Sequence, residues 1–435
     1  MVSAGFILQY DNYNFDPFRN IPYTALYLLT ILEQRMADQV DLSLIDLRGV
    51  KKEAIRHYIP EKDLYLYSVS TPVANETRTI VEVIHEAYPQ AKHIAGGPHI
   101  SLFTEECERL YDAIVLHDGE ESIVAAMEDF INNKLKPVYR QETPCHFHAY
   151  PFASRKYIAK STVTKSGLLP GEYCHLRASE ALFSRGCPYN CHFCANQKLT
   201  FTPVMFRTPQ QITEEIEYLK REYNIGGLAI KDDNAIPVNR KVAIPLLEAI
   251  GETNVKWRGQ SRANGIGPDI VKLAKESGCV DIAIGLESVS PQVLKIINKK
   301  IKLSEAKTYI RYLKEASIGV RLNLILGLPG EPDDIKKQTL DFIDEVQPSS
   351  VLLCLFCPVP GSEMFENPDK FGIQLKDGGW DQYRNTFGRF EEDEQPNFIY
   401  SYKEETPWGK GVSNERNYEI YMELQAVIRE RKLNF

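Results

Sequence analysis

Short apolar runs alternate with amphipathic stretches along two parts of this chain, residues 1–131 and 179–360. Neighbouring parallel strands must be joined by a crossover, usually a helix, so this alternation predicts an α/β protein with parallel sheets. In the first part, runs such as GFILQY, VDLSLIDL and DLYLYSVS predict a doubly wound parallel sheet. The second part, from ALFSRG to SSVLLCLF, predicts a partial (β/α)6 barrel of the TIM type, with its chemistry at the carboxyl ends of the strands.

Irregular sequence bounds the two α/β parts. Residues 132–178 are rich in proline, aromatic and polar residues, and we interpret them as a linker. Residues 361–435 form a smaller C-terminal region that ends in a predicted helix. Aromatic residues in this region are expected either to line or cover a pocket or to pack locally: Trp380, Tyr383, Phe387, Phe390 and Trp408.

Composition narrows the class of protein. The 51 basic residues are outnumbered by 59 acidic ones, which argues against a nucleic acid as the main partner. The N-terminal residues lack the pattern of a secretory signal, and the longest apolar runs are shorter than the ~20 residues of a membrane-spanning helix. The nine cysteines show no disulfide framework. These features predict a cytoplasmic protein that makes no use of a membrane.

Three cysteines are closely spaced. Cys187, Cys191 and Cys194 form a C-x-x-x-C-x-x-C motif directly after the first predicted barrel strand. Thiolates are soft ligands that suit iron–sulfur clusters or zinc. Three ligands on a four-iron cluster leave one iron open to a small molecule. The alternative is a structural zinc loop completed by His192, in a non-enzymatic metal-binding or interaction protein.

The sequence GCPYNCHFC, with Phe193 before the last cysteine, resembles the cluster motif of the radical S-adenosylmethionine (SAM) superfamily. Four further segments resemble motifs of that superfamily in the same order along the chain, each at a predicted strand end. They are KDDN at 231–234, GLES at 285–288, LGLPGE at 326–331 and PVPGSEMF at 358–365. The resemblance covers about residues 180–365.

This resemblance implies a [4Fe–4S] cluster on the three cysteines, whose open iron chelates SAM. An electron donor such as flavodoxin or ferredoxin would reduce the cluster, and cleavage of SAM would give a 5′-deoxyadenosyl radical that abstracts hydrogen from a small-molecule or peptide substrate. The resemblance assigns these residues to SAM: Phe193, Asp232, Asp233, Glu287, Ser288 and Gly327. Arg262 and Arg321 stand on barrel strands, where each either pairs with the SAM carboxylate or makes an ordinary ion pair.

Residues 20–131 resemble the cobalamin-binding domain of many radical SAM enzymes, in IPYTALYLLTIL, AGGPH and LHDGEES. The sequence departs from that family's D-x-H-x-x-G motif, because Arg48 stands where the cobalt-ligating histidine would be. An arginine stays protonated and cannot ligate a metal. Cobalamin binding without this ligand and a domain that kept the fold but lost the cofactor both remain open. His99 and His117 are either other cobalt ligands or ordinary hydrogen-bonding residues.

Three reactions are compatible with these features: cobalamin-dependent methylation of carbon, epimerisation, and ring formation or another radical rearrangement. Epimerisation needs a hydrogen donor, and Cys357 at the end of the last predicted barrel strand is the candidate. The alternative for Cys357 is a small buried apolar residue. Natural-product or peptide maturation is the setting that the resemblance favours.

Overall fold

The computed structural model describes residues 1–10, 18, 20–199, 204–380 and 398–434. The chain divides into two compact units. The N-terminal unit comprises Met1–Val163, Leu199–Phe201 and Gly379–Arg384, and the barrel unit comprises the remainder. No helix among the described residues is both long and apolar enough to cross a membrane.

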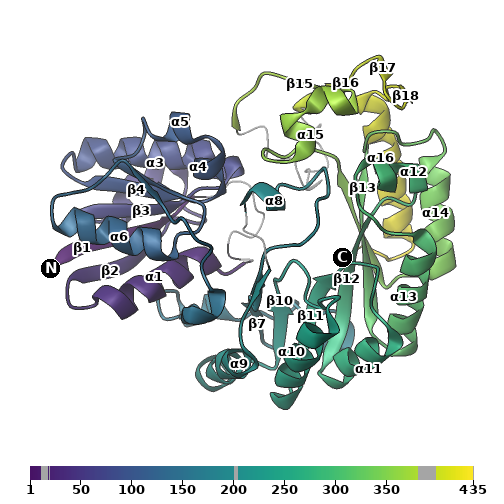
Figure 1. Ribbon diagram of the computed structural model, residues 1–435, viewed down its shortest axis with the longest axis horizontal. Coiled ribbons are helices and arrows are strands. Elements are labelled where there is room, and N and C mark those ends of the chain that lie inside the picture. Colours follow the sequence, from purple (N-terminus) through teal and green to yellow (C-terminus); the bar gives the residue numbers. More distant parts are fainter. Residues whose placement is uncertain (11–17, 19, 200–203, 381–397, 435) are drawn as a thin grey trace. The chain divides into compact units, whose positions relative to one another are not determined.

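The N-terminal unit is built on a six-stranded parallel sheet of order β2-β1-β3-β4-β5-β6 (Figure 1). Its strands are β1 (Val2–Leu8), β2 (Val40–Asp46), β3 (Leu64–Ser68), β4 (Lys92–Gly96), β5 (Ala113–Leu116) and β6 (Val138–Arg140). Helices α1 (Tyr23–Met36) and α6 (Glu120–Ile131) cover one face, and α3 (Ala74–Ala87), α4 (Pro98–Leu102) and α5 (Thr104–Cys107) cover the other. A short α2 (Ile55–Tyr58) precedes β3, and α7 (Lys160–Val163) ends the unit's main segment. The doubly wound sheet is as the sequence predicted.

The strand order places a topological switch point between β1 and β3, because the chain runs from β1 outward to β2 and then returns to β3. In sheets of this kind ligands bind outside the carboxyl ends of the strands at that point. The sixth strand comes from residues 132–178, which the sequence suggested as a linker. A three-residue edge strand is too short to show a periodic pattern.

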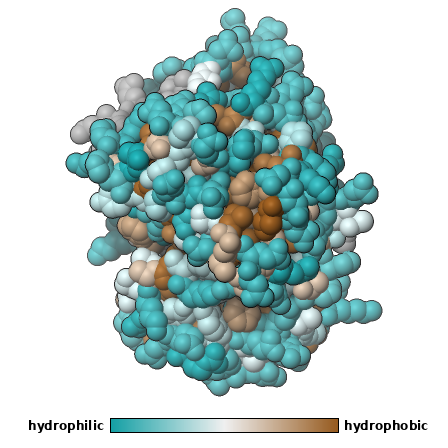
Figure 2. Space-filling model, turned by 90° about the vertical axis from the view of Figure 1, so that its left-hand side faces the viewer, coloured by the Kyte–Doolittle hydropathy of each residue, from teal (hydrophilic) through white to brown (hydrophobic). Residues whose placement is uncertain are grey.

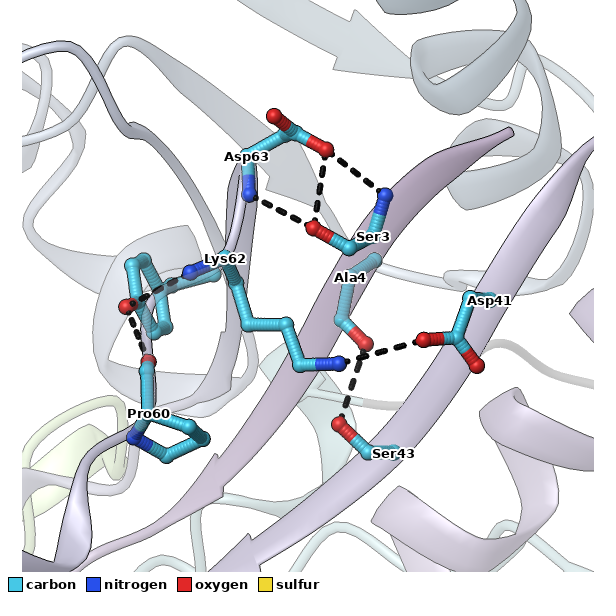
Figure 3. Close-up of polar contacts among 8 residues, drawn as sticks. Ser3, Ala4, Asp41, Ser43, Pro60, Lys62 and Asp63 are labelled. Carbon is cyan, nitrogen blue, oxygen red and sulfur yellow. Dashed lines mark hydrogen bonds and ion pairs between the residues drawn. The ribbon is translucent and has the colours of Figure 1, made fainter.

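Polar contacts join the amino-terminal ends of the strands in this sheet, opposite the ends where ligands bind (Figure 3). The Asp63 carboxylate accepts hydrogen bonds from the backbone N–H and the hydroxyl of Ser3, both at 2.8 Å. Lys62 forms an ion pair with Asp41 at 3.3 Å. These contacts join the starts of β1, β2 and β3, and the bonds from Ser3 lower the pKa of Asp63 below its usual value.

The barrel unit contains a second six-stranded parallel sheet, of order β14-β13-β12-β11-β10-β7, in which every strand neighbours the next parallel strand along the chain. Its strands are β7 (Ala178–Ala181), β10 (Gly227–Ile230), β11 (Lys256–Ser261), β12 (Cys279–Glu287), β13 (Gly319–Leu326) and β14 (Ser350–Leu355). The helices between them are α9 (Pro209–Tyr223), α10 (Arg240–Glu252), α11 (Pro268–Glu276), α12 (Pro291–Ile296), α13 (Leu303–Glu315) and α14 (Ile335–Val346). This is the predicted partial barrel.

The first barrel strand, β7, lies before the run ALFSRG that was predicted to form it and shares only Ala181 with that run. It ends at Ala181 because the backbone N–H of Phe183 donates to the Asp232 carboxylate at 2.7 Å instead of continuing the sheet. Ser184–Arg185 then form β8, which pairs antiparallel with β9 (Met205–Phe206). This small ribbon flanks the cysteine motif, which is followed by α8 (Asn196–Leu199).

The C-terminal region of the barrel unit packs beside β14. Helix α16 (Asn414–Glu430) contacts β14, and the Val351 N–H donates to Leu433 O at 2.8 Å. Shorter elements precede α16: α15 (Glu363–Glu366), β15 (Ile373–Leu375), β16 (Tyr400–Tyr402), β17 (Glu405–Thr406) and β18 (Gly409–Lys410). The molecular face in Figure 2 is mostly hydrophilic, with hydrophobic residues in small groups. Of the aromatic residues predicted near a pocket, Tyr383, Phe387 and Phe390 lie outside the described residues.

Candidate active site

The three motif cysteines share one loop between β8 and α8, at the carboxyl end of the barrel sheet. The Cys194 N–H donates to Cys191 O at 3.0 Å, which turns the loop back on itself. The segment after α12 holds the loop from outside: the Asn298 amide donates to Asn190 O at 2.6 Å, and the His192 N–H donates to Ile297 O at 3.0 Å.

The contacts of His192 bear on whether the loop would hold a single zinc ion or a cluster. His192 directs Nδ1 to Ile296 O at 2.8 Å and packs its ring edge against Phe371. His192 is thus directed to residues outside the cysteine motif, and the three thiols are soft ligands that suit an iron–sulfur cluster.

Two side chains donate to the cysteine sulfurs. Arg262 Nη1 lies 3.4 Å from Cys191 Sγ, and Asn234 Nδ2 lies 3.7 Å from Cys187 Sγ. The Arg262 guanidinium also stacks 3.7 Å from the centre of the Tyr189 ring and donates to Lys299 O. Burial raises the pKa of the Cys194 thiol to about 11, so positive charge is needed nearby to stabilise a thiolate. Arg262 is thus brought to the cysteines, and Asn234 was missed by the sequence analysis although it ends the KDDN motif.

The two aspartates of KDDN have different surroundings. Asp232 is fully buried and accepts hydrogen bonds from the Phe183 N–H and the Ser184 hydroxyl, each at 2.7 Å. Burial raises the pKa of Asp232 to about 7. Burial raises the pKa of Asp233, and a hydrogen bond with the side chain of Asn196, in the helix that follows the cysteines, opposes that rise. Asp232 therefore supports the start of the cysteine loop, whereas Asp233 contacts the helix at its end.

Glu287 sits at an irregularity in β12, with the positive φ of 70° that is unusual for a residue with a side chain. Its carboxylate forms an ion pair with Lys299 at 2.7 Å, and both side chains are largely buried. Lys299 Nζ also lies 5.7 Å from the centre of the Phe193 ring. The Ser288 hydroxyl accepts from the Ser290 N–H at 3.2 Å and stabilises the turn that follows. Lys299 joins this group although the sequence analysis did not single it out, because no motif in this part of the chain contains it.

Gly327 begins the turn after β13 with a φ of 86°, which favours glycine. The Glu331 carboxylate accepts from the N–H groups of Gly327 and Leu328 at 2.9 and 3.2 Å, and the Tyr402 hydroxyl donates to Gly327 O at 2.7 Å. A Cβ at position 327 would lie 3.2 Å from Asn417 Nδ2. The turn is therefore fixed from both sides.

Arg321 lies away from the carboxyl ends of the barrel strands, whereas Cys357 follows one of them, as the sequence predicted. Arg321 is the third residue of β13, five residues before its carboxyl end. Burial raises the pKa of Asp281, near the start of β12, and the charge of Arg321 opposes that rise. Cys357 follows β14, and burial raises the pKa of its thiol to about 12. The ring of the preceding residue, Phe356, lies 5.2 Å from that of Tyr400 of β16, so this segment packs against the C-terminal region of the barrel unit.

In the N-terminal unit, Arg48 is held by the end of β2. Its guanidinium makes two hydrogen bonds to the Asp46 carboxylate, at 2.8 and 2.7 Å, and a third to Asn20 O at 3.0 Å. The Phe18 ring lies 5.1 Å away. Gly97, after β4, has a φ of 101°, and a Cβ there would lie 2.8 Å from the backbone of Val69. The loops after β3 and β4 are therefore closely packed.

The two histidines of this unit have distinct settings. His99 is buried, with Nδ1 3.3 Å from the Thr71 hydroxyl and its ring against Trp380, and burial lowers its pKa to about 4. His117 is partly buried, with a φ of 62°. The nearby Asp118 accepts a hydrogen bond from the Cys145 N–H at 3.2 Å. None of these contacts brings a histidine to Arg48 among the residues that the structure describes.

Residues 182–343 match the family model of the radical SAM superfamily. A protein of Pyrococcus horikoshii named as an uncharacterized methyltransferase is 24% identical over 344 residues, which cover 75% of this chain and 72% of the relative. An anaerobic magnesium-protoporphyrin IX monomethyl ester cyclase of Cereibacter sphaeroides is 25% identical over 72% of this chain, which spans only 54% of the cyclase.

Two solved structures share the fold. The radical SAM methyltransferase TsrM from Kitasatospora setae, with cobalamin and a [4Fe–4S] cluster bound, has a TM-score of 0.70 at 16% identity, covering 98% of this chain and 89% of TsrM. The cobalamin-dependent radical enzyme OxsB, with aqua-cobalamin and SAM bound, has a TM-score of 0.65 at 18% identity, covering 79% of this chain and 52% of OxsB. The likeness to TsrM extends over both units.

Proposed function

We propose that this chain, which belongs to the radical SAM superfamily, uses a [4Fe–4S] cluster, SAM and cobalamin to transfer a methyl group to a carbon atom of a small organic substrate. The observation that carries the proposal is the shared architecture of both units with a cobalamin-bound methyltransferase, combined with three cysteines on one loop at the carboxyl end of the barrel sheet. Relatives named as methyltransferases support methyl transfer. The cytoplasm is the proposed location, because the cluster would need a reducing environment.

The barrel residues have separate tasks in this proposal. Cys187, Cys191 and Cys194 hold the cluster, which when bound supplies the electron that cleaves SAM. The ammonium group of SAM needs an anionic acceptor, and we assign this role to Asp233, which contacts Asn196 beside the cysteine loop. Lys299 is the complementary cation for the SAM carboxylate, and its partner Glu287 then accepts from the ribose hydroxyls.

The N-terminal unit fits cobalamin without a protein ligand from β2. Arg48 cannot ligate cobalt, and its two bonds to Asp46 hold it at the carboxyl end of the sheet. The switch point between β1 and β3 provides the edge where ligands of such sheets bind. The turn at Gly97 allows the close approach of backbone segments beside that edge.

The test is anaerobic reconstitution of the full chain with iron, sulfide and hydroxocobalamin, followed by desalting and visible spectroscopy. We expect an iron–sulfur spectrum together with a retained corrin band. An iron–sulfur spectrum without corrin would contradict the cobalamin assignment and would move Cys357, as a hydrogen donor for epimerisation, to the front. Stoichiometric zinc in protein purified without oxygen would contradict the enzyme assignment altogether.

Ring formation is the second candidate, because two of the relatives are cyclases of 25% and 26% identity. The products separate the two reactions. Methyl transfer with radical chemistry yields S-adenosylhomocysteine as well as 5′-deoxyadenosine, whereas ring formation without methyl transfer yields no S-adenosylhomocysteine. Incubating the reconstituted enzyme with SAM, a low-potential reductant and candidate substrates, and quantifying both nucleosides, decides between them.

A further inference from the structure

We propose that the groove between α12 and α13 docks a small acidic one-electron carrier protein that reduces the cluster. The inference rests on the proposed function, because only a redox-active cluster on the cysteine loop needs such a carrier. It adds the surface on which the carrier binds and the charges that recognise it.

The segment that joins α12 to α13 is strongly basic. Residues 295–302 read KIINKKIK, with four lysines and no acidic residue, in a chain whose net charge is −8. Lys295, Lys300 and Lys302 are exposed. The acidic residue that faces them, Glu305, lies 3.3 Å from Lys302 and offsets one of the charges. A net positive patch on an acidic protein attracts and orients an acidic partner.

The same lysines border a groove of about 760 Å³. Its floor is apolar, formed by side chains that include Leu294, Ile301 and Leu303, and Asn298 lines one wall. An apolar centre inside a charged rim is the usual composition of a protein interface. Electron-transfer partners bury small interfaces, so a groove of this size with a few charges is sufficient for a transient complex.

The groove adjoins the cysteine loop directly. Asn298 lines the groove and donates to the carbonyl of Asn190, the residue before Cys191, at 2.6 Å. The next residue, Lys299, accepts a hydrogen bond at its carbonyl from Arg262, whose other nitrogen lies 3.4 Å from Cys191 Sγ. Asn298 and Asn190 therefore connect the groove to the backbone beside Cys191, so a carrier bound there would lie close to a cluster ligand. This connection distinguishes the groove from the basic residues elsewhere on the barrel helices.

A single-stranded nucleic acid is the competing partner for a basic groove. Such ligands are bound by aromatic side chains that stack on the bases as well as by positive charge. None of the described residues that line this groove is aromatic. The redox carrier is therefore the occupant that the groove and its position favour, and nucleic-acid binding becomes an outcome of the test.

The experiment compares two triple charge reversals in the full, reconstituted chain. The test variant is Lys295→Glu/Lys300→Glu/Lys302→Glu. The matched control is Lys241→Glu/Lys272→Glu/Lys337→Glu, which makes the same change in net charge at exposed lysines on α10, α11 and α14. The second-order rate of cluster reduction by reduced flavodoxin, and separately by reduced ferredoxin, is followed by stopped-flow absorbance at several salt concentrations.

We expect the test variant to be reduced at least about tenfold more slowly than the control at low salt, with a weaker dependence on salt. Reduction by dithionite and the iron content should be equal in all three proteins. Equal carrier rates in the two variants would overturn the proposal, as would failure of both carriers to reduce a cluster that dithionite reduces. Oligonucleotide binding that is lost in the test variant while the carrier rates are unchanged would also overturn it. If dithionite produced no SAM cleavage in the unaltered protein, the proposed function itself would fail.

Discussion

The carboxyl ends of the two parallel sheets differ in the side chains found where metal ligands are expected. In the barrel unit, Arg262 and Asn234 lie against named cysteine sulfurs, and Glu287 and Lys299 form a buried pair beside them. In the N-terminal unit, the Arg48 guanidinium donates to Asp46 and offers no ligand atom to a metal. The doubly wound sheet thus keeps the position where such sheets bind a ligand but offers no metal ligand at Arg48. The barrel loop provides both the position and the candidate cysteine ligands.

Removal of the cysteines should have the largest effect on the barrel site. Single changes Cys187→Ala, Cys191→Ala and Cys194→Ala should each abolish SAM cleavage, because a cluster held by two thiolates is not retained. The fold should remain, since hydrogen bonds between the loop and residues 296–298 also hold it in place. Iron analysis and 5′-deoxyadenosine production measure the loss, and circular dichroism checks the fold. Cleavage retained in all three variants would refute the assignment of the site.

The buried ion pair tests how tightly the barrel groups are coupled. Lys299→Met leaves the Glu287 carboxylate without its cation, so the free energy of unfolding should fall by about 3 kcal/mol, and the affinity for SAM should fall as well. The double variant Glu287→Gln/Lys299→Met is the control, because it leaves no buried charge and should recover most of the stability but not the affinity. Urea denaturation and equilibrium binding measure the two quantities. A single variant as stable as the double would show that the pair is not coupled.

Glu331 should make the free energy of unfolding of the barrel unit depend on pH. Burial raises its pKa from 4.5 to about 8, so between these values the folded protein keeps a proton that the unfolded chain has lost. Its contribution to stability is therefore present below pH 4.5 and is lost as the pH rises through 8. Glu331→Gln should reduce this slope and be more stable than the unaltered protein at pH 9, on the order of 2 kcal/mol. Urea denaturation at pH 6 and pH 9 checks this, and an unchanged slope would contradict it.

The N-terminal unit can be given the ligand that it lacks. Arg48→His places an imidazole beside Asp46, and a neighbouring carboxylate makes an imidazole a better metal ligand. We expect the variant to bind cobalamin about tenfold more tightly, with a shifted corrin spectrum. Arg48→Ala is the control, because it loses the contact with Asp46 without adding a ligand and should show no shift. Identical spectra for the two variants would mean that this loop does not face the cobalt.

The sequence predicted both sheets because buried parallel strands and their crossover helices repeat in a way that short-range patterns report. It also indicated the cysteine motif as a candidate cluster site, because the spacing of these residues is local; that assignment stays a prediction. It could not separate Asp232 from Asp233, since their difference arises from contacts with Phe183 and Ser184, far away along the chain. Lys299 was missed for the same reason: its importance comes from a carboxylate twelve residues earlier and from the folded turn that joins them.

The smallest effect is expected at the amino-terminal ends of the strands in the N-terminal sheet, where none of the described candidate site residues lies. The bonds from Ser3 lower the pKa of Asp63, so its contribution to stability is present above the unfolded pKa of about 3.8 and is lost as the pH falls through the lower folded value. Asp63→Asn should reduce the free energy of unfolding at pH 7 by less than about 1 kcal/mol, because this group is exposed and water screens it. The difference should vanish at pH 2, and cobalamin binding should be unchanged. Thermal denaturation at both pH values measures the first effect, and a corrin band altered by this change would show that the two edges of the sheet are not independent.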